Sequence, residues 1–117
     1  GAAFVNDVLR KDGFAETLVP TLRTSYERIS LVDAETRVRL TADLNVRCCT
    51  VDGKEVSVNG VVIETKSPNS PGHIDRALWR HGHRPVRLSK YATGMAATHS
   101  ELPRNKWHQT IRRHISD

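Results

Sequence analysis

A chain of 117 residues with 38% hydrophobic residues holds at most one domain, and it can bury roughly two-thirds of its unfolded surface. No apolar run approaches the ~20 residues that a membrane-spanning helix needs, so we expect a soluble, cytoplasmic protein, and any membrane tether would lie outside this sequence. Eighteen Lys and Arg against thirteen Asp and Glu give a formal net charge of +5. This excess predicts an anionic partner, such as phosphate chains, nucleic acid or lipid headgroups.

The start of the sequence, its cysteines and its histidines show no sign of secretion or of a metal cluster. No basic segment precedes an apolar one, and the chain begins Gly-Ala-Ala, so we expect a piece of a longer protein without a signal peptide. Cys48 and Cys49 are adjacent, which strains a mutual disulfide, and two thiols cannot fill a four-ligand zinc site. We interpret them as ordinary strand residues in a reducing compartment. The six His have the wrong spacing for a metal cluster and are expected on the surface.

Alternation between apolar and polar side chains predicts strands in the first half of the chain, after a helix-like opening segment that ends at Gly13. A turn signal at residues 51–54 and the Asn59-Gly60 dipeptide separate the later strands. The predicted strands, in chain order, are residues 21–30, 36–46, 56–58 and 61–66.

Helical spacing predicts helices in the second half of the chain. The Pro- and Ser-rich residues 67–72 end the last strand, because proline cannot donate to a strand ladder. Apolar residues at i, i+3 and i+4 then predict a helix that ends at Gly82, with Ser70 as a candidate N-cap and Pro71 at the first helical position. Residues 84–90 are predicted to be extended, residues 90–98 helical, and residues 103–117 an amphipathic helix with a basic side. We assign Trp79, Tyr91 and Trp107 to the core.

Charged side chains share faces of the predicted strands. In the second strand the alternation places Arg37, Arg39, Thr41 and Asp43 on one face, opposite a row of apolar residues. Tyr26 and Arg28 share a face of the first strand, and Glu64 and Lys66 share a face of the last. A solvated outer face of an antiparallel sheet would explain such a pattern. A sheet that curls so that its charged face lines an interior would explain it as well.

The second interpretation requires an anion. Several cations that point at one space repel each other, which is tolerable only where water or a polyanion fills the space. Arg binds phosphate oxygens in a bidentate manner and Lys acts as a point charge, so a mixed set suits phosphates. Glu64 is then either a salt-bridge partner that orients the cations or a ligand for Mg²⁺ or Mn²⁺. Asp43 is expected to pair with a neighbouring cation.

Four motifs in order, "SYER", "RVRLTADLNV", "VVIETK" and "RLSKYATG", resemble the second half of the VTC (vacuolar transporter chaperone) domain. This is the polyphosphate polymerase family within the triphosphate tunnel metalloenzymes, and the resemblance covers about residues 18–105. It implies an α+β fold in which an antiparallel sheet with flanking helices forms a tunnel of eight strands lined with basic residues. In that tunnel the γ-phosphate of ATP is transferred to a polyphosphate chain with Mn²⁺ or Mg²⁺. Residues 1–117 would be a single partial domain, the C-terminal half of such a tunnel, completed by a missing N-terminal half or by a partner subunit.

The resemblance also implies roles for individual residues. Tyr26 and Arg28 match a Tyr-x-Arg motif, and Arg39 matches the Arg that opens an Arg-x-Thr/Ser-x-Asp strand. Glu64 matches a metal-binding glutamate with Lys66 beside it, and Ser89 and Lys90 match a Ser-Lys pair that contacts phosphate. Arg37 lies outside the motifs and joins the set only through its alternation with Arg39. The expected catalytic residues are Arg28, Arg39, Lys66 and Lys90, the phosphate ligands are these four with Tyr26, Arg37 and Ser89, and the metal ligand is Glu64.

Two other functions fit the same residues. The basic face could capture polyphosphate or an inositol polyphosphate without turnover, as a binding module. A nucleic-acid binder would also fit the net charge and the basic C-terminal helix, although the sequence has no helix-turn-helix, zinc-finger or RNA-recognition signature. The sequence does not distinguish synthesis from hydrolysis, because the same tunnel architecture hosts both reactions.

Overall fold

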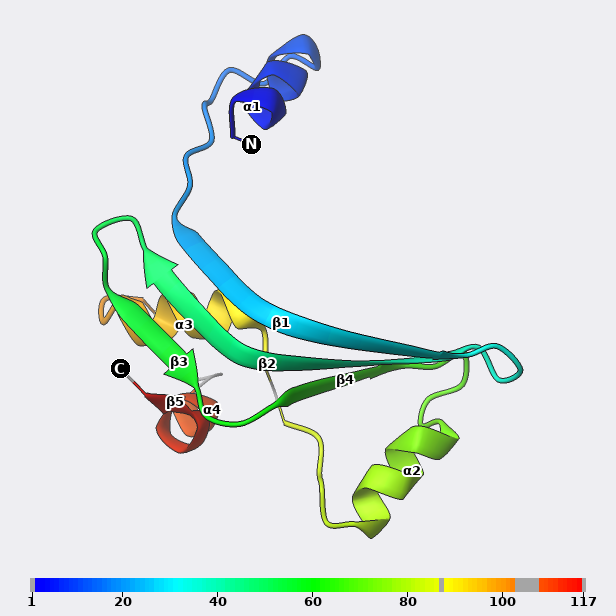
Figure 1. Cartoon of the computed structure of the whole chain (residues 1–117). Coiled ribbons are helices and arrows are strands. Elements are labelled where there is room, and N and C mark those ends of the chain that lie inside the picture. The colour runs from blue at the N-terminus through cyan, green and yellow to red at the C-terminus, as the bar shows by residue number, and fades with distance from the viewer. Residues whose placement is uncertain (1, 87, 103–107, 117) are drawn as a thin grey trace.

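The computed structural model describes residues 2–86, 88–102 and 108–116 of the chain. These residues form an α+β protein, a five-stranded antiparallel sheet with flanking helices (Figure 1). Within the described residues the sheet is open rather than closed into a barrel, which agrees with half of a tunnel. The elements in chain order are α1 (Ala2–Lys11), β1 (Leu22–Asp33), β2 (Val38–Thr50), β3 (Glu55–Val58), β4 (Val62–Lys66), α2 (His73–Arg80), α3 (Lys90–Thr98), α4 (His108–His114) and β5 (Ile115–Ser116).

The β2 strand is the centre of the sheet. It pairs with β1 along one edge and with β3 and then β4 along the other, so the four predicted strands are confirmed. Both β1 and β2 are longer than the alternation predicted, and Cys48 and Cys49 lie in β2 as expected. Opposite partners in an antiparallel pair share a face, and the register places Arg28, Ser30, Arg39, Thr41, Asp43, Glu64 and Lys66 together on one face, called the charged face below.

Arg37 does not continue this face. It lies in the turn between β1 and β2 with a positive φ of 59°, and β2 begins only at Val38. The turn is held by Asp33, whose carboxylate accepts hydrogen bonds from the Glu35 backbone N–H at 3.0 Å and the Thr36 hydroxyl at 2.6 Å. The alternation that placed Arg37 beside Arg39 is therefore wrong, because the strand ends where the turn starts.

A β-bulge at Asn45 changes which residues of β2 point to the charged side. The register shifts between the pairs Ser25↔Arg47 and Glu27↔Leu44, and Asn45 takes a positive φ of 52°. Its side-chain amide donates to the Glu27 carboxylate at 2.8 Å. Because of the extra residue, Val46 and Cys48 point to the same side as Asp43. The sheet thus has a charged end and an apolar end on one side.

The α3 helix covers the apolar end. Val46, Cys48, Val56 and Ala96 are buried there and belong to the core. The approach is close because α3 has Gly94 against the sheet: a Cβ at this position would lie 2.7 Å from Cys48 Sγ and 2.9 Å from Leu22 Cδ2. The core therefore depends on a residue without a side chain.

The helix ends differ from the predicted ones in several places. The N-cap of α2 is Gly72 rather than Ser70, because Asp75 accepts a hydrogen bond from the Gly72 N–H at 2.7 Å and thereby fixes the start of the helix. Gly82 follows α2 with a φ of 85°, as a glycine terminator should. Residues 84–86, 88 and 89 belong to no helix and to no strand, so the extended segment stays a prediction, whereas the predicted helix from Lys90 is confirmed.

The C-terminal segment and the aromatic residues also depart from expectation. In the described part of the predicted C-terminal helix, α4 ends at His114 and the chain continues as β5, which pairs with β3. Tyr91 is 56% exposed rather than in the core, Trp79 is half-buried, and Trp107 lies outside the described residues. None of the described helices is long and apolar enough to cross a membrane.

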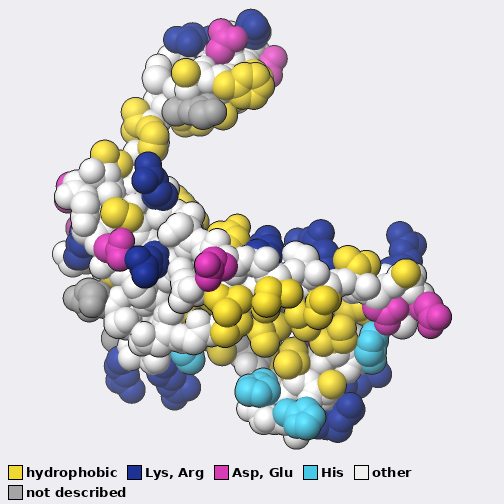
Figure 2. All heavy atoms as spheres, viewed as in Figure 1, with side chains coloured by type: hydrophobic (Ala, Val, Ile, Leu, Met, Phe, Trp, Pro, Cys, Tyr) yellow, Lys and Arg dark blue, Asp and Glu magenta, His cyan; other side chains and the backbone are white. Residues whose placement is uncertain are grey.

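The other side of the β1–β2 hairpin is apolar and is exposed along β1, whereas Val38 of β2 on the same side is buried. Figure 2 shows hydrophobic side chains gathered between the long strands and α2. Ile29 and Leu31 on β1 are more than half exposed, and Ile63 on β4 is nearly so. This surface is called the apolar face below.

The close approach at Gly94 gives a prediction that runs against helix propensity. Alanine is the better helix former by about 1 kcal/mol, yet we expect Gly94→Ala to destabilise the protein by about 1–3 kcal/mol, because the new methyl group overpacks the α3–sheet contact. Urea unfolding of the two proteins measures this difference.

Cys48→Ala provides the matched test of this cause. It removes the sulfur nearest to the new methyl group, so the double variant should lose less stability than the sum of the two single variants. Additive losses would contradict the proposed clash.

Candidate anion-binding face

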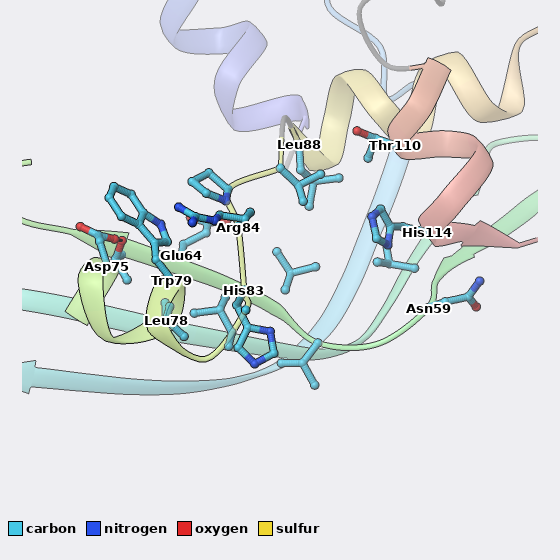
Figure 3. Close-up of a pocket in the computed structure, with 18 residues that line it drawn as sticks. Asn59, Glu64, Asp75, Leu78, Trp79, His83, Arg84, Leu88, Thr110 and His114 are labelled. Atoms are coloured by element: carbon cyan, nitrogen blue, oxygen red, sulfur yellow. Dashed lines mark hydrogen bonds between the residues drawn. The ribbon is translucent and has the colours of Figure 1, made fainter. Parts of the chain in front are cut away.

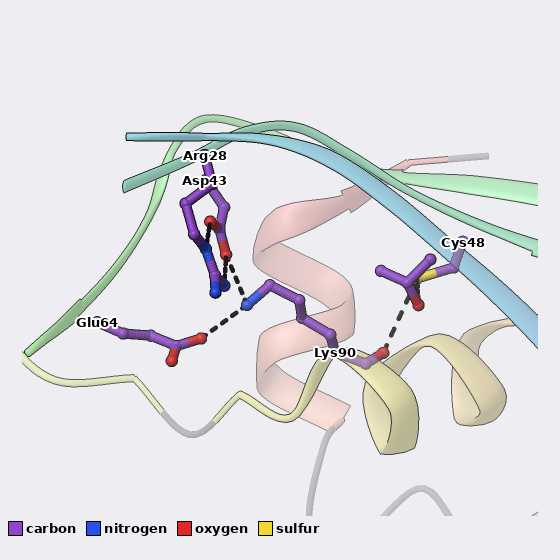
Figure 4. Close-up of polar contacts among 6 residues, drawn as sticks. Arg28, Asp43, Cys48, Glu64 and Lys90 are labelled. Atoms are coloured by element: carbon purple, nitrogen blue, oxygen red, sulfur yellow. Dashed lines mark hydrogen bonds and ion pairs between the residues drawn. The ribbon is translucent and has the colours of Figure 1, made fainter. Parts of the chain in front are cut away.

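A buried carboxylate holds two cations together on the charged face. The register places Arg28 of β1 directly opposite Asp43 of β2. Arg28 Nε donates to Asp43 Oδ1 at 2.6 Å and Nη2 donates to Oδ2 at 2.8 Å, a bidentate pair (Figure 4). The Asp43 side chain is fully buried. The expectation that Asp43 pairs with a neighbouring cation is thereby confirmed.

Lys90 joins this pair from a distant part of the sequence. It is the first residue of α3, and its Nζ lies 2.8 Å from Asp43 Oδ2 and 2.7 Å from Glu64 Oε1. Its side chain is 15% exposed, whereas that of Glu64 is 47% exposed. Lys90 thus bridges an inner carboxylate on β2 and an outer one on β4.

The Tyr26 ring lies next to both cations. Arg28 Cζ is 4.9 Å and Lys90 Nζ 5.3 Å from the ring centroid, within the range of cation–π attraction. The ring holds the two cations near its face by this attraction. It does not accept hydrogen bonds from their N–H donors. Those donors remain directed to oxygen atoms.

The pKa values of the three central groups reflect this pairing. Hydrogen bonds from Arg28 and then from Lys90, together with their charges, outweigh burial and lower the pKa of Asp43 to about 2. The hydrogen bond with Asp43 raises the pKa of Arg28 further above its ordinary value. Burial lowers the pKa of Lys90, but the bonds with Asp43 and Glu64 more than offset it, so the net pKa is raised. All three groups are charged at neutral pH.

Two further cations extend the charged face towards the hairpin turn. Arg39 of β2 lies directly opposite Lys66 of β4 in the strand register, and both side chains are exposed. Across the part of the chain that the structure describes, no ion pair involves either residue. Two neighbouring like charges destabilise a sheet unless an anion or water lies between them. This end of the face is therefore suited to an anionic ligand.

The structure brings together part of the set expected from the sequence. Tyr26, Arg28, Glu64 and Lys90 form one cluster, and Arg39 and Lys66 lie on the same face. Ser89 precedes α3, and its carbonyl accepts the first helical hydrogen bond, from the Thr93 N–H at 2.8 Å. Arg37 is apart, in the turn. Their roles as phosphate ligands stay predictions.

Glu64 offers hard carboxylate oxygens that suit Mn²⁺ or Mg²⁺. Among the described residues, no group of three or more His, Cys, Asp or Glu could hold a metal ion. Mg²⁺ sites commonly use one or two carboxylates and take their other ligands from phosphates and water. The residues therefore fit a divalent ion that arrives with a phosphate ligand, with Glu64 as the protein ligand.

A cavity of about 510 Å³ adjoins the charged face at β4 (Figure 3). It is bounded by β4, α2, the segment after α2 and α4, and Glu64 is among its lining residues. Inside it, the Arg84 guanidinium carbon lies 5.8 Å from the centroid of the half-buried Trp79 ring. Glu64 is thus accessible from both the face and the cavity.

The fold and the site define a class: an α+β domain whose open antiparallel sheet presents cations, aligned by a buried carboxylate, on one face. The sequence model of the VTC domain matches residues 7–99, and the chain therefore belongs to the VTC domain family. It is a domain related to polyphosphate polymerases. No curated protein and no solved structure matches the chain significantly.

The buried carboxylate makes stability depend on pH. The pKa of Asp43 is lower in the folded than in the unfolded protein, so its contribution is complete above the unfolded pKa of about 4 and is lost as pH falls towards 2. The contribution is at most about 2 kcal/mol, because solvent screens the partly exposed Arg28. In urea unfolding, the difference in stability between wild type and Asp43→Asn should shrink between pH 4 and pH 2.

Asp7→Asn is the matched control. Asp7 pairs with Lys11 on the exposed surface of α1 at 3.1 Å, so this variant should change stability by less than about 0.5 kcal/mol. If the difference in unfolding free energy between wild type and Asp43→Asn did not change with pH, the charge of the Asp43 carboxylate would not contribute to stability.

Proposed function

We propose that the charged face binds the phosphate oxygens of a polyphosphate chain. In a complete tunnel, the same face would support transfer of the γ-phosphate of ATP to that chain, with Mn²⁺ or Mg²⁺. The observation that carries this proposal is the alignment of Arg28 and Lys90 by the buried Asp43, in a chain of the VTC domain family. Side chains fixed before the ligand arrives lose little freedom on binding.

The charge balance of the face supports a ligand with several negative charges. Arg28 and Lys90 are compensated by Asp43 and Glu64, whereas Arg39 and Lys66 are additional cations, which leaves a surplus of two positive charges. Asp43 engages two of the five N–H donors of Arg28. The remaining donors can bind phosphate oxygens without breaking this pair.

In this proposal the protein mainly positions phosphates and neutralises charge. Arg28, Arg39, Lys66 and Lys90 hold non-bridging oxygens, with Tyr26 and Ser89 as further ligands. Glu64 would hold a divalent metal ion, which when bound would supply positive charge next to the phosphoryl group that is transferred. No general base is required, because the attacking phosphate oxygen is already ionised at neutral pH.

The open sheet determines how this function would be completed. The tunnel needs further strands, from an N-terminal half of the domain or from a partner subunit. The open state also favours the second candidate function, a binding module that captures polyphosphate or an inositol polyphosphate without turnover. ATP with Mn²⁺ separates the two, since only the polymerase releases ADP and lengthens the phosphate chain.

The exposed cations provide a test that leaves the fold intact. Arg39→Ala and Lys66→Ala should each weaken tripolyphosphate binding about tenfold in calorimetry, because each removes one charge-assisted contact. Arg28 and Lys90 are less suitable, since removing either one also leaves the buried Asp43 with one partner fewer.

Arg23→Ala and Arg47→Ala are matched controls with the same change in net charge. Both residues are exposed and lie on the opposite side of the sheet, so each should weaken binding less than about threefold. Equal effects of all four variants would show a diffuse electrostatic attraction and would overturn the assignment of the binding site to the charged face. Equal competition by an oligonucleotide of the same charge would favour the nucleic-acid alternative.

A further inference from the structure

The Lys90 bridge has two unequal ends. The inner end, Asp43, is buried and also bound by Arg28, so it is fixed. The outer end, Glu64, is about half exposed and is bound at Oε1 by Lys90. A ligand that needs Lys90 will therefore displace Glu64 and leave Asp43 in place, because breaking the inner contact would leave a buried charge with fewer partners.

A free divalent metal ion meets an obstacle at Glu64. One carboxylate oxygen already accepts a hydrogen bond from an ammonium group at 2.7 Å. A metal ion bound there would lie near that ammonium, and two like charges in one site disfavour each other. The metal must therefore either share the carboxylate with Lys90 or displace it.

A phosphate ligand removes this obstacle. Its oxygens accept hydrogen bonds from Lys90 in place of Glu64, which satisfies the ammonium and frees the carboxylate. The same phosphate supplies the further oxygen ligands that the described residues do not provide around Glu64.

We propose that Lys90 prevents free metal ions from binding to Glu64, and that the site binds a divalent metal ion only as a complex with a phosphate chain. This inference rests on the proposed binding of phosphate to the charged face. It makes Lys90 a residue that determines which form of the ligand binds, in addition to its contact with phosphate. Metal and phosphate then favour each other's binding, by reciprocal factors.

Binding of Mn²⁺ alone, followed by the electron paramagnetic resonance signal of free Mn²⁺, tests the inference without any turnover. The wild type should bind Mn²⁺ weakly. Lys90→Gln should bind it at least about tenfold more tightly, because Glu64 becomes free, while the glutamine amide can still donate to Asp43. The double variant Lys90→Gln with Glu64→Gln should return to weak binding.

Lys66→Gln is the matched control for charge alone. Lys66 lies on the same strand and the same face as Glu64, and no ion pair links it to Glu64 within the described residues. Its removal should raise Mn²⁺ affinity less than about threefold. Equal gains in Lys66→Gln and Lys90→Gln would overturn the inference.

A second variant keeps the inference testable if Lys90→Gln fails to fold. Glu64→Gln should bind metal-free tripolyphosphate, in the presence of a chelator, at least about fivefold more tightly than wild type, because Lys90 no longer has a competing carboxylate. Glu27→Gln, on the other side of the sheet, should change this affinity less than twofold. No gain in Glu64→Gln would contradict the inference.

The two proposals fail in different ways. If wild type and Glu64→Gln both fail to bind tripolyphosphate, the proposed function is wrong, while the Mn²⁺ titrations still show whether Lys90 prevents free metal ions from binding to Glu64. If tripolyphosphate binds but Lys90→Gln gains no Mn²⁺ affinity over Lys66→Gln, the proposed function stands and the inference is wrong.

Discussion

The bidentate pair between Arg28 and the buried Asp43, extended to Lys90, is the interaction on which the rest of the structure depends. A carboxylate without partners could not be buried between β2 and α3, because its desolvation would cost several kcal/mol. With Arg28 and Lys90 it stays ionised, with a pKa of about 2. The same three side chains connect β1, β2 and the first residue of α3. Stability and the arrangement of the proposed ligand site thus have a common origin.

The alternating sequence pattern predicts most of the sheet, because each strand repeats its side-chain direction every two residues. It fails where the backbone leaves the ideal strand. Asn45 adds a residue and reverses the phase of β2, and Arg37 takes a left-handed conformation in a turn. Neither event leaves a clear signal, since a single polar or charged residue fits strand, bulge and turn equally well.

The site was only partly predictable for a different reason. The residue types on the strands indicate a ligand with negative charge, but the position of Lys90 depends on tertiary packing. Gly94 lets α3 approach the sheet closely enough for the Lys90 side chain to reach both Asp43 and Glu64. No local sequence pattern around Lys90 predicts how closely α3 approaches the sheet. The same limit applies to α2, where the Asp75 carboxylate, rather than the residue before the proline, determines the start of the helix.

The contact between α3 and the sheet has a consequence for the chemistry of the two adjacent thiols. Cys48 is buried under α3, where loss of solvent raises its pKa, whereas its neighbour Cys49 points to the opposite side of β2. Alkylating reagents can reach Cys48 only when the helix lifts from the sheet. The two neighbouring thiols can therefore be compared within one chain. The alkylation rate of Cys48 relative to that of Cys49 reports how often α3 opens in solution.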